Sequence, residues 1–433
     1  MPIGATAATA TAPPDPGVLL RSRQYLGLLV LAAVIGVPIS AAAYGFLALI
    51  HYVQDWVFDD LPGGLGFDGA PVWWPLPVLV VAGLLVGLAI RYLPGEGGHK
   101  PAEGFKAGPP TTPIELPGVA LAALASLGLG VVLGPEAPLI ALGGGLAVWA
   151  VHLAKRDAPP NTVAVVAAAG SFAAISALLG SPLLAAFLLM EISVLGGPML
   201  GVLLIPGLLA AGVGSLIFVG LGDWTGLGTL SLAIPDLPAV GQPDIADFGW
   251  AVVIGLAAAP LGAGIRWLGL LLQPRVERRM LLLTPVAGVA IALLAIIFAE
   301  ATGKSSSEVL FSGQEALGPL LNQSGSYSGA ALLLLIVCKG LAYSVSLSCF
   351  RGGPIFPAMF IGAAGGLALS DLPGLPAIAG AAMGVGAMSV VMLKLPLTSV
   401  LLATLLLASN GLTLMPLVIV SVVVAYVASA RLT

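Results

Sequence analysis

The feature that most constrains this chain is a series of apolar runs, most of them about 20 residues long, that recurs along almost its whole length. These runs cover residues 25–50, 75–90, 116–133, 162–179, 199–221, 249–272, 280–299, 329–348 and 412–430. Only 8% of the residues are charged, against about 25% in an average soluble domain. We therefore expect an all-α, polytopic integral membrane protein of the cell membrane.

The charged residues near the N-terminus indicate how the chain is oriented in the bilayer. Residues 1–20 are rich in Ala, Thr and Pro, and we expect a disordered tail there, on the cytoplasmic side. Arg21 and Arg23 directly precede the first apolar run, which the positive-inside rule places toward the cytoplasm. Lys155, Arg156 and the basic cluster at 275–279 mark further cytoplasmic loops by the same rule.

Several partner classes are disfavoured by composition. The net charge is −4, and the sequence has no cluster of basic residues that could bind a phosphate backbone, so we expect no nucleic-acid partner. Cys338 and Cys349 both fall in or beside one apolar run, and no spacing typical of metal ligands accompanies them. We therefore expect neither a metal nor a cofactor. Among possible partners, we expect the chain to contact the lipid bilayer.

Glycine and proline are unusually frequent for a chain that crosses a membrane. The 433 residues include 58 Gly and 35 Pro, many of them inside the apolar runs. Such residues break helices, and a break is tolerated at membrane depth only where the freed backbone groups face protein or a water-lined cavity. Interrupted helices of this kind are typical of transporters and channels.

Two sequence echoes indicate an internal duplication. The segment 138–143 resembles 357–362, and 181–184 resembles 395–398 at nearly the same separation. We expect one transmembrane domain over residues 21–433, a duplicated helical bundle of the inverted-repeat kind found in transporters. Its first half covers about 25–221, its linker 222–247 and its second half about 248–433. The polar stretch 300–328 is expected to be an external loop that either covers an entrance or simply connects two helices.

Glu136 is the strongest candidate for a functional side chain. It lies between Gly134-Pro135 and Ala137-Pro138, where one apolar helix stops and the next begins. A helix N-terminus exposes free N–H groups and partial positive charge, which together attract anions. Glu136 is therefore interpreted as a gate that occupies an anion site and leaves when protonated or displaced. The alternative is a carboxylate that only caps its own helix.

A second segment, 351–357, repeats this arrangement before another apolar helix. Pro354, Ile355 and Phe356 stand at the expected helix start, directly after two glycines. Backbone N–H groups suit halide-like anions, because partial charges attract the ion without holding it too tightly for release. We expect the helix starts at 134–138 and 354–357 to converge on one anion.

These motifs resemble those of the CLC family of chloride channels and chloride/proton antiporters. Residues 134–138 are similar to the family's Gly-x-Glu-Gly-Pro segment, and 354–357 to its Gly-Ile-Phe-x-Pro segment. Residues 97–101 stand where a Gly-Ser-Gly-Ile-Pro segment is expected, but without its serine. Order and spacing also match at 170–191 and 394–398. The resemblance runs from about Tyr25 to the C-terminus and marks a divergent member without the soluble CBS pair that some members carry.

The resemblance implies a homodimer with a separate pore in each subunit. Glu136 would be the external gate, and the anion site would involve Gly134, Pro135, Ala137, Pro354, Ile355 and Phe356, with Gly98 and His99 toward the cytoplasmic side. Glu191 is a possible proton relay or a structural acid at a helix end. The place after it, where exchangers of the family often carry a glutamate, holds Ile192. Tyr426 falls too early to match the family's pore tyrosine.

The expected function is transport of a small inorganic anion, chloride first, through a channel or a weakly coupled chloride/proton antiporter. The alternative is a secondary transporter for another small solute or another anion such as fluoride. An enzyme acting on lipid-linked substrates is disfavoured, because only three histidines occur and they are spread over positions 51, 99 and 152.

Overall fold

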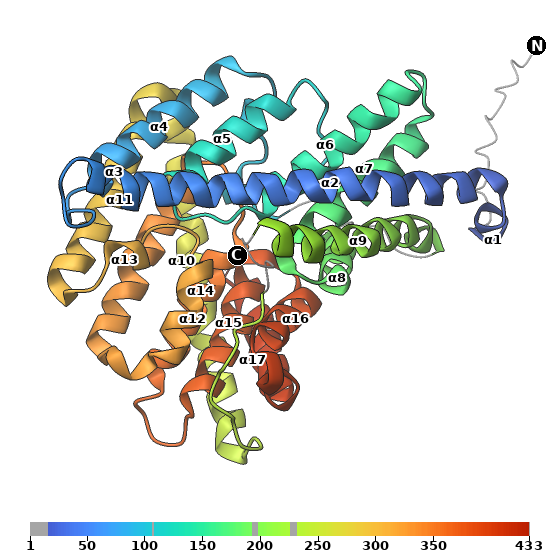
Figure 1. Cartoon of the computed structure of the whole chain (residues 1–433). Helices are drawn as coiled ribbons and strands as arrows, with labels where there is room; N and C mark the ends of the chain where they lie inside the picture. The colour runs from blue at the N-terminus through green and yellow to red at the C-terminus, as the bar shows by residue number, and fades with distance from the viewer. Residues whose placement is uncertain (1–15, 106–107, 193–197, 226–231, 433) are drawn as a thin grey trace, which may run out of the picture.

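In the computed structural model, the described part of the chain is entirely helical apart from turns and one isolated bridge (Figure 1). The structure describes residues 16–105, 108–192, 198–225 and 232–432. Its α-helices are α1 (Pro16–Leu20), α2 (Arg23–Asp55), α3 (Leu61–Gly64), α4 (Pro75–Tyr92), α5 (Leu116–Gly128), α6 (Glu136–Ala154), α7 (Pro160–Leu179), α8 (Pro182–Ile192), α9 (Pro198–Thr225), α10 (Ile245–Arg278), α11 (Met280–Thr302), α12 (Gln314–Asn322), α13 (Gly329–Cys349), α14 (Ile355–Leu369), α15 (Ala377–Leu393), α16 (Pro396–Leu406) and α17 (Gly411–Ala430).

The predicted class, an all-α polytopic membrane protein, is confirmed. Within the described ranges, nine helices are long and apolar enough to cross a bilayer. One expected span is wrong: α5 has only 13 residues, because the chain leaves the helix at a glycine-containing turn in which Gly130 has φ 91°. The span is instead α6, whose 19 residues begin at Glu136.

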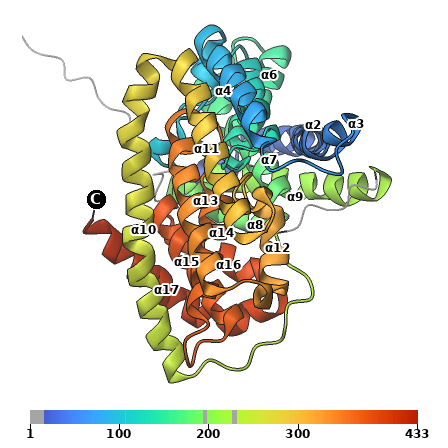
Figure 2. The same cartoon turned by 90° about the vertical axis from the view of Figure 1, so that its left-hand side faces the viewer.

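The order of helices after each broken segment is the same in both parts of the chain. Helices α6 to α9 follow the first break, and α14 to α17 follow the second, with a short 11-residue helix third in each set. Helix α6 packs on α7, and α14 packs on α15. The third helices of the two sets, α8 and α16, contact each other. The long helix α10 runs along one side of the second set (Figure 2).

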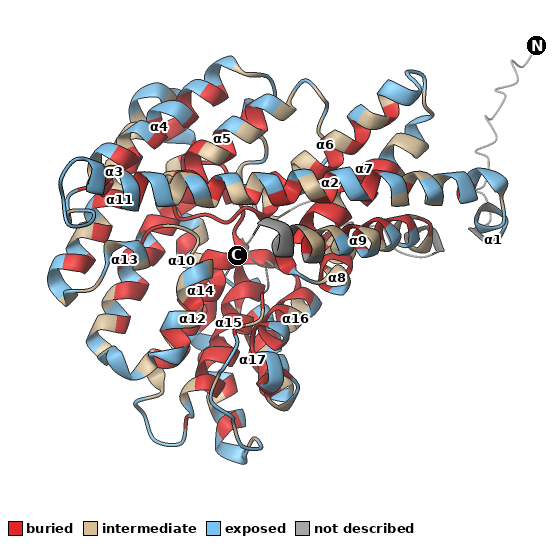
Figure 3. Cartoon of the chain, viewed as in Figure 1, coloured by how far each residue is buried: buried red, intermediate tan, exposed pale blue. Residues whose placement is uncertain are grey.

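Helices α14 and α15 form the buried centre of the second set (Figure 3). They approach so closely that a Cβ added at Gly362, Gly366 or Gly384 would overlap backbone atoms of the facing helix. Glycine at these contacts lets the two backbones pack without side chains between them, as small residues do in membrane helix pairs. This packing holds the first turn of α14 away from both lipid and solvent, since every residue from Ile355 to Ala364 is buried.

Two regions that were expected to be non-helical contain helices. The stretch 300–328 contains α12 as well as two 3₁₀ turns, Ser306–Glu308 and Ser324–Ser326, so the expectation of a plain loop is corrected. Helix α12 forms because Leu317, Leu320 and Leu321 share one buried face. Of the expected tail, residues 1–15 lie outside the described part, and residues 16–20 form α1. Of the expected linker 222–247, residues 226–231 lie outside it.

Candidate functional site

The two broken segments that precede α6 and α14 pair with each other at the centre of the molecule. The N–H of Gly134 donates to the carbonyl of Gly353 over 2.8 Å, and the N–H of Gly353 donates to the carbonyl of Gly134 over 2.5 Å. The freed backbone groups of one break are thus satisfied by the other, which meets the requirement for irregular backbone inside a membrane protein. This pairing places the starts of α6 and α14 side by side.

Glu136 lies at this junction, with 0% of its surface exposed. Its Oε1 accepts a hydrogen bond of 3.0 Å from the N–H of Phe356, in the first turn of α14. The N–H groups of Ile355 and of Glu136 itself also face the carboxylate. Its Oε2 has no hydrogen-bond partner among the described residues. The carboxylate therefore occupies the N-terminus of a helix from the other half of the chain.

Glycine at positions 134 and 353 leaves the space that this carboxylate fills. A Cβ added at Gly134 would stand 2.6 Å from Glu136 Cδ, and one added at Gly353 would stand 2.7 Å from the same atom. Both distances are far inside van der Waals contact. The two glycines are thus required for the closed position of the side chain, in addition to the hydrogen bonds between them.

The other residues expected around Glu136 shape the two helix starts. Pro135 and Pro354 are the N-cap residues of α6 and α14, and Ala137 follows Glu136 in the first turn of α6. The Pro354 carbonyl accepts a 2.9 Å hydrogen bond from the hydroxyl of Tyr343 on α13. Tyr343 was not singled out from the sequence. Its buried hydroxyl fixes the turn that presents the Phe356 N–H.

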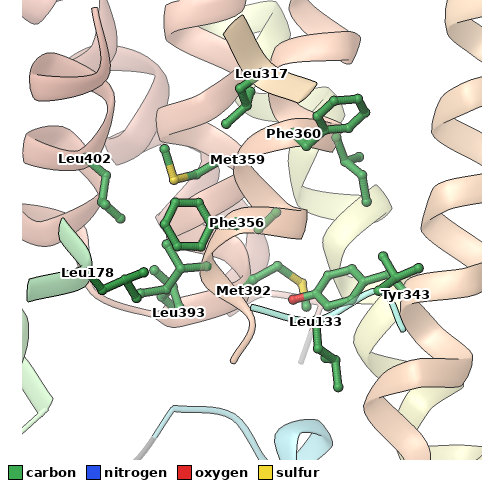
Figure 4. Close-up of a cluster of buried hydrophobic side chains, with 14 of the residues drawn as sticks. Leu133, Leu178, Leu317, Tyr343, Phe356, Met359, Phe360, Met392, Leu393 and Leu402 are labelled. Carbon is green, nitrogen blue, oxygen red and sulfur yellow. The ribbon is translucent and has the colours of Figure 1, made fainter. Parts of the chain in front are cut away.

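Apolar side chains surround the start of α14. Figure 4 shows Tyr343 beside this turn, together with Leu133, Phe356 and Met392. All four are buried, and Tyr343 and Phe356 are 0% exposed. Such surroundings strengthen the attraction between backbone N–H groups and an anion, because there is little water to compete for them.

Gly98 and His99 do not contact Glu136. The backbone here turns through consecutive positive φ angles, 81° at Gly95, 50° at Glu96, 72° at Gly97 and 94° at Gly98. His99 lies at an exposed position, where its Nε2 is 2.6 Å from the carbonyl oxygen of Gly104 in the same loop. The loop instead meets the second broken segment, since Arg351 Nε donates to the Glu96 carbonyl over 3.1 Å.

Glu191 caps a different helix. Its carboxylate accepts from the N–H groups of Leu397 and Thr398 at 2.9 and 2.7 Å, and from the Thr398 hydroxyl at 2.6 Å. All three donors belong to the first turn of α16. Ile192, the next residue, is apolar and 9% exposed. Glu191 therefore joins α8 to α16 in the same way that Glu136 joins α6 to α14.

Lys339 is an intramembrane charge whose role could not be assigned from its sequence context alone. It is 0% exposed, and its three N–H donors are shared among the carbonyl oxygens of residues 308, 309, 310 and 311, which lie 2.9, 3.1, 3.0 and 3.4 Å from Nζ. The ammonium also lies 4.5 Å from the ring centroid of Phe360 on α14, which is cation–π geometry. Lys339 thus anchors the segment before α12 onto α13 and α14.

A cavity of about 360 Å³ lies between the C-terminal end of α2 and α12. Leu133 and Pro135, beside Glu136, form part of its wall, so it reaches the residues next to the buried carboxylate. His51 Nδ1 and Glu315 Oε1 are 2.8 Å apart across it. The remaining acids in its lining are Asp55, Asp59 and Glu308.

The fold and the site together define a class of protein. Helices broken at the centre of a membrane bundle, with backbone N–H groups facing a buried acid, are the arrangement of a transport protein. Comparison with known families agrees. The family model described as "Voltage gated chloride channel" matches residues 82–430. The chain therefore belongs to the voltage-gated chloride channel family, also called the CLC family, which transports anions.

Similar proteins extend over most of the chain. The protein named "Putative ion-transport protein YfeO" from Escherichia fergusonii is 30% identical over 369 residues, which cover 82% of each chain. The protein of the same name from Escherichia coli K12 gives the same identity and coverage. Among solved structures, a slow cyanobacterial Cl⁻/H⁺ antiporter matches with a TM-score of 0.74 and 18% identity, covering 94% of both chains. A CLC-type fluoride/proton antiporter matches with a TM-score of 0.69 and 20% identity, covering 94% of this chain and 96% of its own. At 18–20% identity, these solved structures support the assignment of the fold and nothing further.

Proposed function

We propose that this protein transports small inorganic anions, chloride first, across the cell membrane, and that Glu136 is its gate. The observation that carries the proposal is the hydrogen bond from the Phe356 N–H to the Glu136 carboxylate at the buried start of α14. A carboxylate and a halide compete for the same backbone donors, because both are anions with no hydrogen to donate. Departure of the side chain frees the site for the transported ion.

Protonation is the event that we propose releases Glu136. A neutral carboxyl group has lost the charge that the helix N-terminus attracts, so its hold on the Phe356 N–H weakens. The cavity that reaches Leu133 and Pro135 gives external protons a route toward the acid. Anion flux should therefore rise as the external pH falls.

Proton coupling is proposed to be weak or absent. Ile192 cannot carry a proton, and Glu191 is held by three donors of α16. Transport in this protein is then either a channel process or a loosely coupled exchange. The functional unit is proposed to be a homodimer in which each subunit has its own pathway.

Liposomes loaded with chloride, bromide, nitrate or fluoride test the proposal. The wild type should release anions faster than protein-free liposomes, and faster at lower external pH. Glu136→Gln keeps the shape of the side chain without its charge, and Glu136→Ala removes both, so both variants should conduct with little pH dependence. Asp68→Asn removes an exposed acid and serves as the control.

Two results would count against the proposal. The first is the absence of flux for all four anions in the wild type. The second is a Glu136→Ala variant that melts at lower temperature yet keeps the wild-type pH response, since that combination is what a purely structural cap predicts. Uphill proton movement driven at a fixed ratio by a chloride gradient would contradict weak coupling alone.

A further inference from the structure

Two basic side chains, Arg266 of α10 and Lys394 between α15 and α16, come together without an acidic partner. A Cβ added at Gly262 would stand 2.5 Å from Val391 Cγ1, so α10 and α15 touch one helical turn before Arg266 and three residues before Lys394. The two positive charges are close enough to act on each other. Like charges repel, so an anion bound to both side chains would stabilise the pair.

The hydrogen-bonding groups of this pair are only partly satisfied. Nε of Arg266 is buried and has no hydrogen-bond partner in the described part of the chain. Nζ of Lys394 donates to Ser429 Oγ over 2.8 Å, and an ammonium carries three N–H donors. Neither residue takes part in the ion pairs found within the described ranges. A buried donor without an acceptor costs free energy, and a bound anion would remove that cost.

The pair lies level with the end of α17. Ser429, the partner of Lys394, is followed by Ala430, the last residue of this candidate membrane span, and then by the exposed Arg431. Helices α10 and α17 contact each other and cross (Figure 2). Helix α10 has 34 residues, or about 50 Å of helix, and so exceeds the hydrocarbon core of about 30 Å. Its basic cluster at 275–279 marks this side as cytoplasmic by the positive-inside rule.

The surface beside the pair is apolar and exposed, as expected of a surface that faces lipid. Trp267, directly after Arg266, is 64% exposed, and the exposed Leu270 and Leu271 follow one turn later on α10. Val427 of α17 is 49% exposed. Trp is enriched where membrane helices meet the membrane–water interface. The acyl chains of a lipid can therefore lie on this surface while its headgroup reaches the two basic side chains.

We propose that Arg266 and Lys394 bind the phosphate headgroup of an anionic phospholipid of the cytoplasmic leaflet, beside α10, α17 and the turn that joins α15 to α16. Basic pockets between membrane helices on the cytoplasmic side bind such headgroups. The site is separate from Glu136 and goes beyond the proposed transport.

The competing explanation is purely structural. Arg266 would only pack on the loop at Gly104, where an added Cβ would stand 3.5 Å from Nη2. Lys394 would only hold the end of α17 through Ser429. Both explanations predict that loss of either side chain lowers stability, but only the lipid site predicts a dependence on anionic lipid.

Native mass spectrometry of the detergent-purified protein, titrated with phosphatidylglycerol, measures the proposed binding. Arg266→Gln and Lys394→Gln each remove one charge while retaining a hydrogen-bonding group. Arg156→Gln removes an exposed cation in the loop between α6 and α7 and is the matched control. Phosphatidylcholine, whose headgroup has no net charge, and soluble glycerol 3-phosphate are the comparison ligands.

We expect the phosphatidylglycerol dissociation constant to rise by about fivefold in each single variant, the loss typical of one basic residue near anionic lipid, and further in the double variant. Arg156→Gln should bind like the wild type, and phosphatidylcholine should bind the wild type more weakly. Phosphatidylglycerol should also raise the melting temperature of the wild type more than that of the double variant.

Two results would overturn the proposal. The first is an equal phosphatidylglycerol affinity in the wild type and the double variant, with only a lower melting temperature in the latter. The second is glycerol 3-phosphate that displaces the lipid at equal concentration, because the ligand would then be a soluble phosphate and not a lipid.

Photocrosslinking of the wild type provides a measurement that does not depend on a stable variant. Phosphatidylglycerol with a diazirine in its acyl chain should label α10 near Trp267 and α17 near Val427. Labelling confined to other helices would refute the site. If the wild type moved no anion across liposomes, the proposed transport would fail, whereas lipid binding at Arg266 and Lys394 would still be decided by these measurements.

Discussion

Replacing Gly353 by alanine should open the proposed gate although Glu136 itself is not mutated. The added Cβ would stand 2.7 Å from Glu136 Cδ and 3.0 Å from Glu136 Cβ, and it would overlap Oε2. Gly353 does not have a positive φ, so its backbone can accept alanine. The flexible carboxylate is the group that can move, and moving it breaks its bond to the Phe356 N–H.

The size of the effect follows from that bond. A hydrogen bond to a charged group contributes about 1.5–3 kcal/mol, so the closed position should lose occupancy by about tenfold to a hundredfold. Chloride efflux from liposomes at neutral external pH should rise accordingly, and acidification should add little. Gly365→Ala, on the same helix with open space around its Cβ, should behave like the wild type.

A double variant provides the decisive control. In the Glu136→Ala background the group that the new Cβ displaces is absent, so Gly353→Ala should have no further effect on efflux. If Gly353→Ala folded, kept low efflux at neutral pH and still responded to acidification like the wild type, the carboxylate at the start of α14 would not be the barrier.

Three further predictions concern the supports of the site. Lys339→Met should lower the free energy of unfolding by at least about 3 kcal/mol, because the buried carbonyl groups of residues 308–311 lose the ammonium that bonds them; a thermal melt equal to that of the wild type would contradict this. Glu191→Ala should cost about 0.5–2 kcal/mol as a lost cap of α16 while leaving the pH response of flux unchanged, and a lost pH response would instead indicate a proton relay. The hydrogen bond from His51 holds the pKa of the Glu315 carboxyl below its ordinary value. Its stabilisation is present above the ordinary carboxyl pKa and is lost as pH falls through the lowered one, so the melting temperatures of the wild type and Glu315→Gln should converge in acid; a constant gap would refute the linkage.

The sequence by itself determined the class of protein and the positions of its helix breaks. Runs of apolar residues about as long as the bilayer is thick can only be helices in lipid, because every backbone group must bond within its own segment. Pro and Gly punctuate those runs locally, so the helix starts near Glu136 and Phe356 could be placed in advance. The end of α5 at Gly128 could not be placed in this way, because the apolar run continues through Gly130 although the helix does not.

Only the tertiary structure decided which groups meet. Glu136 was expected at the start of its own helix and at an anion site shared with the helix start at 354–357, and the structure identifies the bond itself, from the N–H of Phe356, 220 residues away. The carbonyl partners of Lys339 were not predictable from its sequence context, and His99 proved to bond within its own loop. Helix starts depend on neighbouring residues, which sequence displays. The acceptor or donor that a buried charge finds depends on how distant helices pack, and that packing is set by close contacts such as Gly134 with Gly353, which only the folded chain brings together.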